Sequence, residues 1–295
     1  MNHGISIKWL VILCMVLGAS AGRAQDQIFT DDSGRVETAI FYGFSARAAH
    51  PTLTIPVGGD WVVIGGGGFT DWQYHGGYGS LLTASYPTDY SLQSWTLKAK
   101  DHAYSDPCVI YGYAIAIRVK GLTRQQLLSY IQLTQATSAW TAHPNVTAYV
   151  NAGYTLLGCG FYDAFSGWGN MAVGSYPANN AACYAEGKDH IYSSPAIMYS
   201  YAISIRSYIP GVGNLVNAIR TNWSGYSNWP EVSVSAPYGY ALAGGGAYAT
   251  YYGYGQMLWK NMPTPRGEWT AGSKDHHRSD PGYVRSYAIG IKVIP

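Results

Sequence analysis

Lys100-Asp101-His102-Ala103-Tyr104-Ser105-Asp106-Pro107 is a phrase that the chain uses three times. The second copy is Lys188-Asp189-His190-Ile191-Tyr192-Ser193-Ser194-Pro195, and the third is Lys274-Asp275-His276-His277-Arg278-Ser279-Asp280-Pro281. Successive copies begin 88 and 86 residues apart, and Tyr-Ala-Ile-x-Ile follows each proline at Tyr113, Tyr201 and Tyr287. A fixed period of this size indicates a repeat architecture. The phrase predicts three equivalent sites before it predicts one active site.

The repeat extends upstream of the phrase through a cluster of small residues. The clusters are Gly66-Gly67-Gly68, Gly158-Cys159-Gly160 and Gly244-Gly245-Gly246. Each is followed by a further glycine, at Gly79, Gly169 or Gly255, eight residues before a proline. We therefore expect three homologous units at residues 34–120, 121–208 and 209–295.

Strand patterns run through every unit. Polar or small residues alternate with apolar ones at Tyr113–Arg118, and β-branched and aromatic residues dominate, which is typical of half-buried strands. Leu122–Thr137 and Val212–Arg220 have a partly helical pattern, but the repeat alignment places strands there. About six short strands per unit predict an all-β fold of three antiparallel repeats. A pseudo-threefold β-prism is favoured over three tandem small β-sandwiches, because no linkers separate the units.

The N-terminal residues and the composition predict an exported protein. Residues 1–24 have a lysine, a short apolar run and small residues near Ala24, which is typical of a secretory signal peptide. Residues 25–33 form an N-terminal extension, and no later segment is apolar enough for a membrane span. The net charge is +2, so nucleic acid is not an expected partner. We expect a secreted protein, or a periplasmic one in a Gram-negative host.

Two of the cysteines depart from the repeat together. Cys183 takes the place of Trp95 and Trp269, and Cys159 takes the place of a cluster glycine, Gly67 or Gly245. Glycine within a strand often marks a close approach, so we expect Trp95 to lie over Gly67 and Trp269 over Gly245. A Cys159–Cys183 disulfide would replace that pair in the second unit, in a compartment that permits it. Cys108 is expected to remain an unpaired small residue.

The repeated phrase has the groups that recognise sugars. A carboxylate and an imidazole bond hydroxyl groups, and an aromatic ring packs on an apolar sugar face. On a strand, lysine and histidine would share one face with the following tyrosine or arginine. The candidate ligand-binding residues are Lys100, Asp101, His102, Tyr104, Lys188, Asp189, His190, Tyr192, Lys274, Asp275, His276 and Arg278. The alternative is that aspartate caps the following turn through backbone amides while lysine is a solvated charge.

Catalytic and metal chemistry are less favoured. Asp101, His102 and Ser105 have the residue types of a triad, but neighbouring strand residues diverge and no nucleophile elbow is present. The histidines His102, His190 and His276 could meet on a threefold axis as a zinc-type site, but separate surface positions are favoured. We therefore expect no enzyme activity, no metal and no cofactor.

Taken together, the glycine cluster, Lys-Asp-His and Tyr-Ala-Ile-x-Ile resemble secreted bacterial repeat proteins. They also resemble the C-terminal β-prism modules of perforin-like insecticidal proteins, over nearly all of the chain after residue 24. The resemblance implies a β-prism that recognises a receptor on a target cell; jacalin-type lectins share that fold, although their sugar-site motif is absent. The sequence thus favours a non-catalytic binder of a glycan or a cell-surface receptor. The alternative is a structural coat or extracellular-matrix scaffold.

Overall fold

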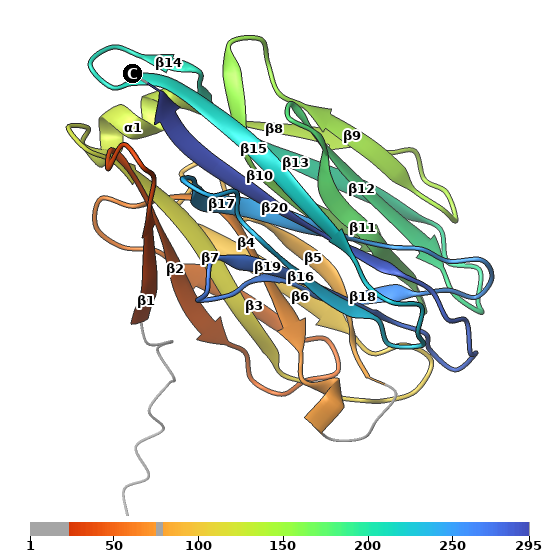
Figure 1. Cartoon of the computed structure of the whole chain (residues 1–295). Helices are drawn as coiled ribbons and strands as arrows, with labels where there is room; N and C mark the ends of the chain where they lie inside the picture. Colours follow the sequence, from red (N-terminus) through yellow and green to blue (C-terminus); the bar gives the residue numbers. More distant parts are fainter. Residues whose placement is uncertain (1–23, 75–78, 295) are drawn as a thin grey trace, which may run out of the picture.

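The computed structural model describes residues 24–74 and 79–294 and is built almost entirely of antiparallel strands (Figure 1). The first unit contains β2 (Val36–Phe44), β3 (Thr52–Pro56), β4 (Val62–Thr70), β5 (Leu81–Pro87), β6 (Ser94–Lys100) and β7 (Ile110–Val119). The second contains β8 (Ile131–Thr137), β9 (Asn145–Tyr149), β10 (Tyr154–Phe165), β11 (Asn170–Asn179), β12 (Ala182–Asp189) and β13 (Ala196–Arg206). The third contains β15 (Gly213–Trp223), β16 (Glu231–Ser235), β17 (Ala241–Ala249), β18 (Met257–Pro263), β19 (Glu268–Lys274) and β20 (Val284–Ile294). The all-β prediction is confirmed.

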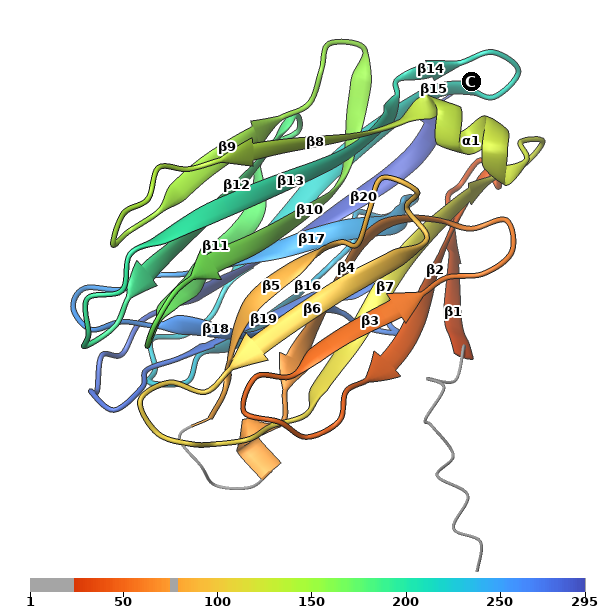
Figure 2. The same ribbon diagram turned by 180° about the vertical axis from the view of Figure 1, so that it is seen from behind.

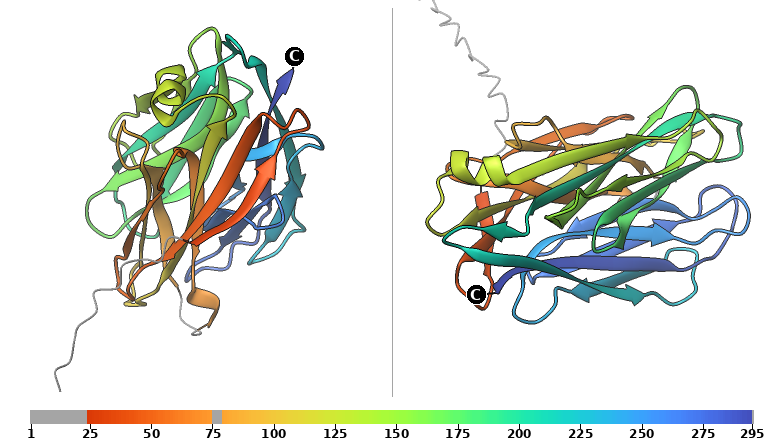
Figure 3. Two further views of the ribbon diagram at one scale, coloured as in Figure 1. Left: turned by 90° about the vertical axis from the view of Figure 1, so that its left-hand side faces the viewer. Right: turned by 90° about the horizontal axis from the view of Figure 1, so that it is seen from above.

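Three sheets share these strands, and every sheet combines two units. With β1 (Ala24–Thr30) and β14 (Tyr208–Ile209) at two of the edges, their strand orders are β1-β2-β7-β4-β18-β19-β16, β3-β6-β5-β10-β13-β8 and β14-β15-β20-β17-β11-β12-β9. The units join through the antiparallel pairs β4–β18, β5–β10 and β11–β17. The units therefore do not close as three tandem sandwiches. Their apolar side chains form a shared core, around which the sheets are arranged in the views of Figure 3.

The first glycine of each cluster lies where the central strands β4, β10 and β17 meet. A Cβ atom added to Gly158 would lie 2.1 Å from the carbonyl oxygen of Ile64. One added to Gly244 would lie 2.6 Å from that of Leu157, and one added to Gly65 would lie 3.0 Å from that of Ala243. The three backbones thus touch in a closed cycle that leaves no room for side chains.

The position matching Gly158 in the first unit is Gly65, so the clusters are Gly65-Gly66-Gly67, Gly158-Cys159-Gly160 and Gly244-Gly245-Gly246, here called the glycine layer. The pairing with the sixth strand sets this register, because Gly66, Cys159 and Gly245 all face the alanine of Tyr-Ala-Ile. The sequence comparison had begun the first cluster at Gly66 and was wrong by one residue. Four consecutive glycines at 65–68 made that register ambiguous.

The second residue of each cluster lies beneath a large side chain or a sulfur. Trp95 packs on Gly66 rather than on Gly67, and Trp269 packs on Gly245, where an added Cβ would meet the indole at 2.6 and 2.2 Å. In the second unit, Cys159 and Cys183 form a disulfide with a Cα–Cα distance of 5.5 Å. The predicted disulfide is confirmed, and Cys108 is free and buried.

One predicted strand is partly a helix. Residues Arg124–Tyr130 form α1, and β8 begins only at Ile131. Thr123 and Gln126 make a capping box, in which each side chain bonds the other residue's backbone amide. Repeat alignment had overridden the helical pattern of this stretch. The matching stretch of the third unit, by contrast, forms the continuous strand β15, preceded by the short β14 (Tyr208–Ile209).

The N-terminal segment joins the sheet. β1 (Ala24–Thr30) pairs with β2 at a sheet edge, so part of the predicted extension at residues 25–33 is a strand. The predicted signal peptide lies outside the described residues except for Ala24. Within the described ranges, no helix is long and apolar enough to cross a membrane.

Candidate functional site

The three copies of the phrase gather at one end of the molecule. They follow β6, β12 and β19 and lead into β7, β13 and β20, whereas α1 and the C-terminus lie at the other end (Figures 1 and 2). We call this end the pole: residues 100–107, 188–195 and 274–281 with the loops that they contact. The phrase does not continue as a strand. Ala103, Ile191 and His277 each have φ between 61° and 65°, and so turn the chain directly after the histidine.

The three repeated histidines converge at the centre of the pole. Their ring centroids lie 5.2 Å apart for His102 with both partners and 5.6 Å apart for His190 with His276. His190 directs Nε2 to the carbonyl oxygen of His276 at 2.6 Å, and His276 directs Nε2 to that of His102 at 2.8 Å. Each histidine is at most 3% exposed. The expectation of separate surface histidines was wrong, because the units share sheets and bring their strand ends together.

Burial sets the protonation of this triangle. It lowers the pKa of His102 to about 3 and that of His276 to about 2, and nearby cationic groups lower both further. The pKa of His190 is also lowered by burial, although its bonds to Tyr254 and His276 oppose the shift. The ring nitrogens of His190 and His276 that face carbonyl oxygens do not face a shared centre. Across residues 24–74 and 79–294, no cluster of three potential ligands is arranged to hold a metal ion.

The three lysines are buried, not solvated, and they connect neighbouring units. Lys100 Nζ donates to the carbonyl oxygen of Trp168 at 2.7 Å, and Lys188 Nζ donates to that of Tyr254. Each ammonium group also lies over an aromatic ring, at 3.7 Å from the centroid of Phe165 for Lys100. Burial lowers the pKa of Lys100 to about 8 and that of Lys274 to about 7.

The repeated glycine after each cluster makes room for a lysine of the preceding unit. A Cβ atom on Gly169 would lie 2.8 Å from Lys100 Nζ, and one on Gly255 would lie 2.9 Å from Lys188 Nζ. Gly79 stands in the same relation to Lys274, at 2.8 Å. All three have positive φ, which favours glycine. Each lysine thus locks its unit to the next around a closed cycle.

The aspartate of the phrase caps the turn. Asp101 accepts a hydrogen bond from the backbone amide of Asp106 at 3.0 Å, and Asp275 accepts one from that of Asp280 at 3.1 Å. The capping alternative therefore describes this aspartate in the first and third units. In the second unit the aspartate contacts a side chain, because His143 Nε2 lies 3.2 Å from Asp189 Oδ1.

The seventh residue of the phrase holds the glycine loop of its own unit. The amide of Gly169 donates to Ser194 Oγ at 3.0 Å, and the amide of Gly255 donates to Asp280 Oδ2 at 2.6 Å. Asp106 accepts from Gly79 in the same way. The phrase thus fixes two loops, one through its lysine and one through its seventh residue.

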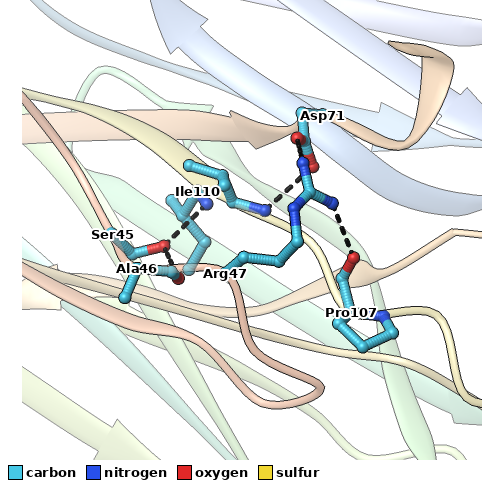
Figure 4. Close-up of polar contacts among 7 residues, drawn as sticks. Ser45, Ala46, Arg47, Asp71, Pro107 and Ile110 are labelled. Carbon is cyan, nitrogen blue, oxygen red and sulfur yellow. Dashed lines mark hydrogen bonds and ion pairs between the residues drawn. The ribbon is translucent and has the colours of Figure 1, made fainter. Parts of the chain in front are cut away.

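A repeated serine anchors the strand that follows the phrase, and sequence reasoning missed it. The Oγ of Ser45 accepts from the amide of Ile110 and donates to the carbonyl of Ala46 (Figure 4). Ser138 and Ser224 make the same two bonds in the other units. The signal in the sequence was a serine directly after the first strand of each unit, β2, β8 or β15.

The first unit adds an ion pair at this point. Arg47 bonds Asp71 and also donates to the carbonyl oxygen of Pro107 at 2.8 Å (Figure 4). Asp71 in turn accepts from the amide of Val109. In the third unit the hydroxyl of Thr250 accepts from the amide of Tyr283 instead. The end of the first phrase is therefore held by charge, while the third is held by a neutral group.

Each phrase borders its own hollow, which opens to solvent. The hollow at the first phrase has a volume of about 470 Å³ and is lined by Asp101, Tyr104 and Ser105 with Trp168 of the next unit. The second, of about 230 Å³, is lined by Asp189, Tyr192 and Ser193 with Tyr254 of the next unit. The third, of about 250 Å³, has Asp275, Arg278 and Ser279 with Trp72 of the first unit and the exposed Trp229.

The predicted lysines, histidines and tyrosines thus divide into two groups. Lysine and histidine are at most 3% exposed and build the pole, whereas Tyr104 and Tyr192 are 60% and 51% exposed at its rim. The expected common face of histidine and tyrosine was wrong, because the turn after the histidine separates them. Sequence reasoning also missed Trp168 and Tyr254, although an aromatic residue directly before the repeated glycine was a visible signal.

Comparison with known proteins does not assign the chain to a family. No protein-family model matches the chain, and no curated protein shows a significant match.

Proposed function

We propose that the protein is an exported, non-catalytic binding protein that holds glycan residues in the three hollows of its pole. The observation that carries the proposal is the repeated construction of these hollows. Each combines the aspartate, the serine and the rim residue of one phrase with an aromatic residue of the next unit. Carboxylate and hydroxyl groups bond sugar hydroxyls, and exposed rings pack on the apolar faces of sugars.

The proposal includes the symmetry of the fold. We interpret the cyclic exchange of strands as a pseudo-threefold β-prism, because the pairs β4–β18, β5–β10 and β11–β17 join equivalent strands. The resemblance to the receptor-binding modules of perforin-like insecticidal proteins agrees with that interpretation and favours a cell-surface glycan or receptor. Three equivalent sites would gain about 10²–10⁴ in avidity on a ligand that spans them.

Export and the lack of catalysis are parts of the same proposal. The disulfide supports an oxidising compartment, in line with the predicted signal peptide. His190 and His276 direct ring nitrogens to carbonyl oxygens, so they are poorly placed to activate the serine of their phrases. Asp101 is likewise engaged by the amide of Asp106.

The test is a glycan array with the mature protein, followed by calorimetry on the best ligand. Trp168→Ala and Tyr254→Ala should each remove one binding site, lowering the stoichiometry by one while the remaining sites bind. Tyr149→Ala, which changes an exposed tyrosine outside the hollows, is the matched control. The histidines are unsuitable for this test because they are buried. Absence of glycan or cell binding by the folded protein, together with ordered self-assembly, would favour the coat or matrix scaffold instead.

A further inference from the structure

Another hollow lies away from the pole, on the sheet that joins the second and third units. It has a volume of about 480 Å³ and opens where β11 meets β17, with residues of β15 and β20 on one side. None of its lining residues belongs to the three hollows of the pole. Its size lies within the range of about 300–1,000 Å³ that is typical of small-ligand sites.

Aromatic rings line this hollow. Tyr176 stacks on Tyr287 with centroids 4.9 Å apart and an angle of 14° between the planes. Tyr248 lies 5.5 Å from Tyr176 and 6.3 Å from Trp223, whose plane is turned by 73°. Trp223 is 45% exposed, whereas Tyr176 and Tyr248 are half-buried and Tyr287 is buried. Rings in two orientations suit a ligand with an apolar face and a defined edge.

The only cation in the lining is Arg285, which lies between two of these rings. Its guanidinium carbon is 5.2 Å from the centroid of Trp223 and 5.0 Å from that of Tyr287, and Nη2 donates to Thr221 Oγ1 at 2.8 Å. Arg285 also interacts with the hydroxyl of Tyr287 and opposes the rise that burial causes in the pKa of that tyrosine. The hollow has no acidic residue in its lining. The nearby Glu186 lies outside the lining and is engaged by the hydroxyl of Tyr184 at 3.0 Å.

Equivalent positions on another sheet share the rings but not the charge. Where β5 meets β10, Tyr86 stacks on Tyr162 and Tyr201, matching Tyr176 with Tyr248 and Tyr287. Tyr199 there takes the place of Arg285, and its strand partner Thr137 takes the place of Trp223. The stacked tyrosines thus occur on two of the three sheets, whereas Met262 takes the place of Tyr176 where β18 meets β4. Of the two sheets with stacked tyrosines, only this one adds a guanidinium with an indole.

We propose that this hollow binds an acidic pyranose, such as a uronic-acid residue of a polysaccharide. Arg285 would pair with the carboxylate, since a guanidinium fork matches carboxylate geometry. Trp223 and Tyr248 would pack against the apolar face of the sugar ring. The site differs from the hollows of the pole in position and in charge, so it extends the proposed function to a second class of ligand.

The experiment titrates the mature protein with tri-galacturonate and with a neutral galactose trisaccharide, by calorimetry and by amide NMR. Tri-galacturonate should bind, and the neutral sugar should bind at least about tenfold more weakly at this hollow. Arg285→Gln should weaken tri-galacturonate at least about tenfold, whereas Arg285→Lys should weaken it less. Trp223→Ala should weaken it while leaving the charge in place. Tyr199→Gln changes the equivalent position of the other sheet and should leave binding unchanged.

Three results would overturn the proposal: equal binding of both sugars at this hollow, unchanged affinity in folded Arg285→Gln and Trp223→Ala, or loss of binding in Tyr199→Gln. The variant Trp168→Ala separates this site from the pole. Tri-galacturonate binding that disappears in Trp168→Ala and persists in Arg285→Gln would assign the acidic sugar to the pole, and would refute this inference while supporting the proposed function.

Discussion

The glycine layer and the pole hold the same three units together by opposite means. In the glycine layer, the backbones of neighbouring units touch because side chains are absent, as at Gly158 and Ile64. At the pole, long polar side chains such as Lys100 cross from one unit to a carbonyl of the next. The glycine layer tolerates a change of chemistry, because in the second unit a disulfide replaces a tryptophan that packs on glycine. It has no space for an added side chain where the backbones touch. The pole keeps lysine, aspartate and histidine, and it varies at its exposed rim and at the seventh residue of the phrase, where Ser194 replaces an aspartate.

The largest effect should come from adding one methyl group to the glycine layer. In Gly158→Ala, the new Cβ would lie 2.1 Å from a backbone oxygen of β4, and neither backbone can move without breaking its sheet. We expect a loss of about 4 kcal/mol or more in the free energy of unfolding, measured by urea denaturation. Gly225→Ala is the control, because nothing lies within 4 Å of its added Cβ, and it should change stability by less than about 0.5 kcal/mol. Similar denaturation midpoints for both variants would show that the backbones of the glycine layer can separate to admit a methyl group.

The disulfide should contribute about 3 kcal/mol, as expected for a bond that closes a loop of this length. Cys159→Ala with Cys183→Ala should lower the free energy of unfolding by about that amount. Thermal unfolding of the variant beside the oxidised and the reduced protein measures it. Equal stability of all three would mean that the covalent bond adds nothing to the packing of the layer.

A second double variant tests whether a glycine–tryptophan pair can replace the disulfide. Cys159→Gly with Cys183→Trp rebuilds the arrangement of Gly66 and Trp95. The indole of Trp95 donates to Ser85 Oγ at 2.9 Å, and the second unit carries a buried serine, Ser175, at the matching place. We expect this variant to recover most of the stability that the double alanine variant loses. A variant no more stable than the double alanine protein would contradict equivalence.

The two regions also differ in what the sequence allowed to be predicted. The disulfide followed from two coordinated departures, because Cys159 and Cys183 replaced the two members of one packed pair. The convergence of His102, His190 and His276 did not follow, because residues 86 or more apart in sequence meet only through the exchange of strands between units. A period identifies a unit, but it does not say which unit supplies the neighbouring strand. For the same reason the aromatic walls of the hollows, such as Trp168, were missed.

Acid should act on the pole rather than on the glycine layer. An unfolded histidine titrates near pH 6.5, whereas the pKa of His102 is lowered to about 3 and that of His276 to about 2. Between these values the unfolded chain binds more protons, so stability is fully present above pH 6.5 and falls as the pH is lowered. At pH 5 each histidine should cost about 2 kcal/mol relative to pH 8.

Urea denaturation between pH 5 and pH 8 measures this slope. His102→Gln should make it shallower by one histidine. His50→Gln removes an exposed imidazole that lies 3.4 Å from Asp101 Oδ1, and so measures how much of the slope comes from that contact instead. Lys100 and Lys274, whose pKa values are lowered to about 8 and about 7, and Asp163, whose pKa is raised to about 7, also titrate in this window. They do so in the wild type and in the variant, so the contribution of His102 is the difference between the two slopes. A slope that survives His102→Gln unaltered would place the acid sensitivity elsewhere.

Asp163 is a departure of the second unit near the pole. Neither carboxylate oxygen has a hydrogen-bond partner among residues 24–74 and 79–294, and burial raises its pKa to about 7. The third unit has Ala249 at the matching place. A carboxyl group with a raised pKa weakens the fold as the pH rises from about 4 through 7, because the ionised form is the one that burial disfavours.

Asp163→Ala should therefore stabilise the protein at pH 8 by about 1–3 kcal/mol, and the gain should shrink as the pH falls towards 4. Asp163→Asn keeps the volume and removes the charge, so it separates the cost of ionisation from that of a cavity. The opposing effect is the attraction between Asp163 and Lys100, which raises the pKa of that lysine. If Asp163→Ala is instead destabilising at pH 8, that attraction outweighs the cost of burying the carboxylate. The pole would then depend on charge balance as strictly as the glycine layer depends on volume.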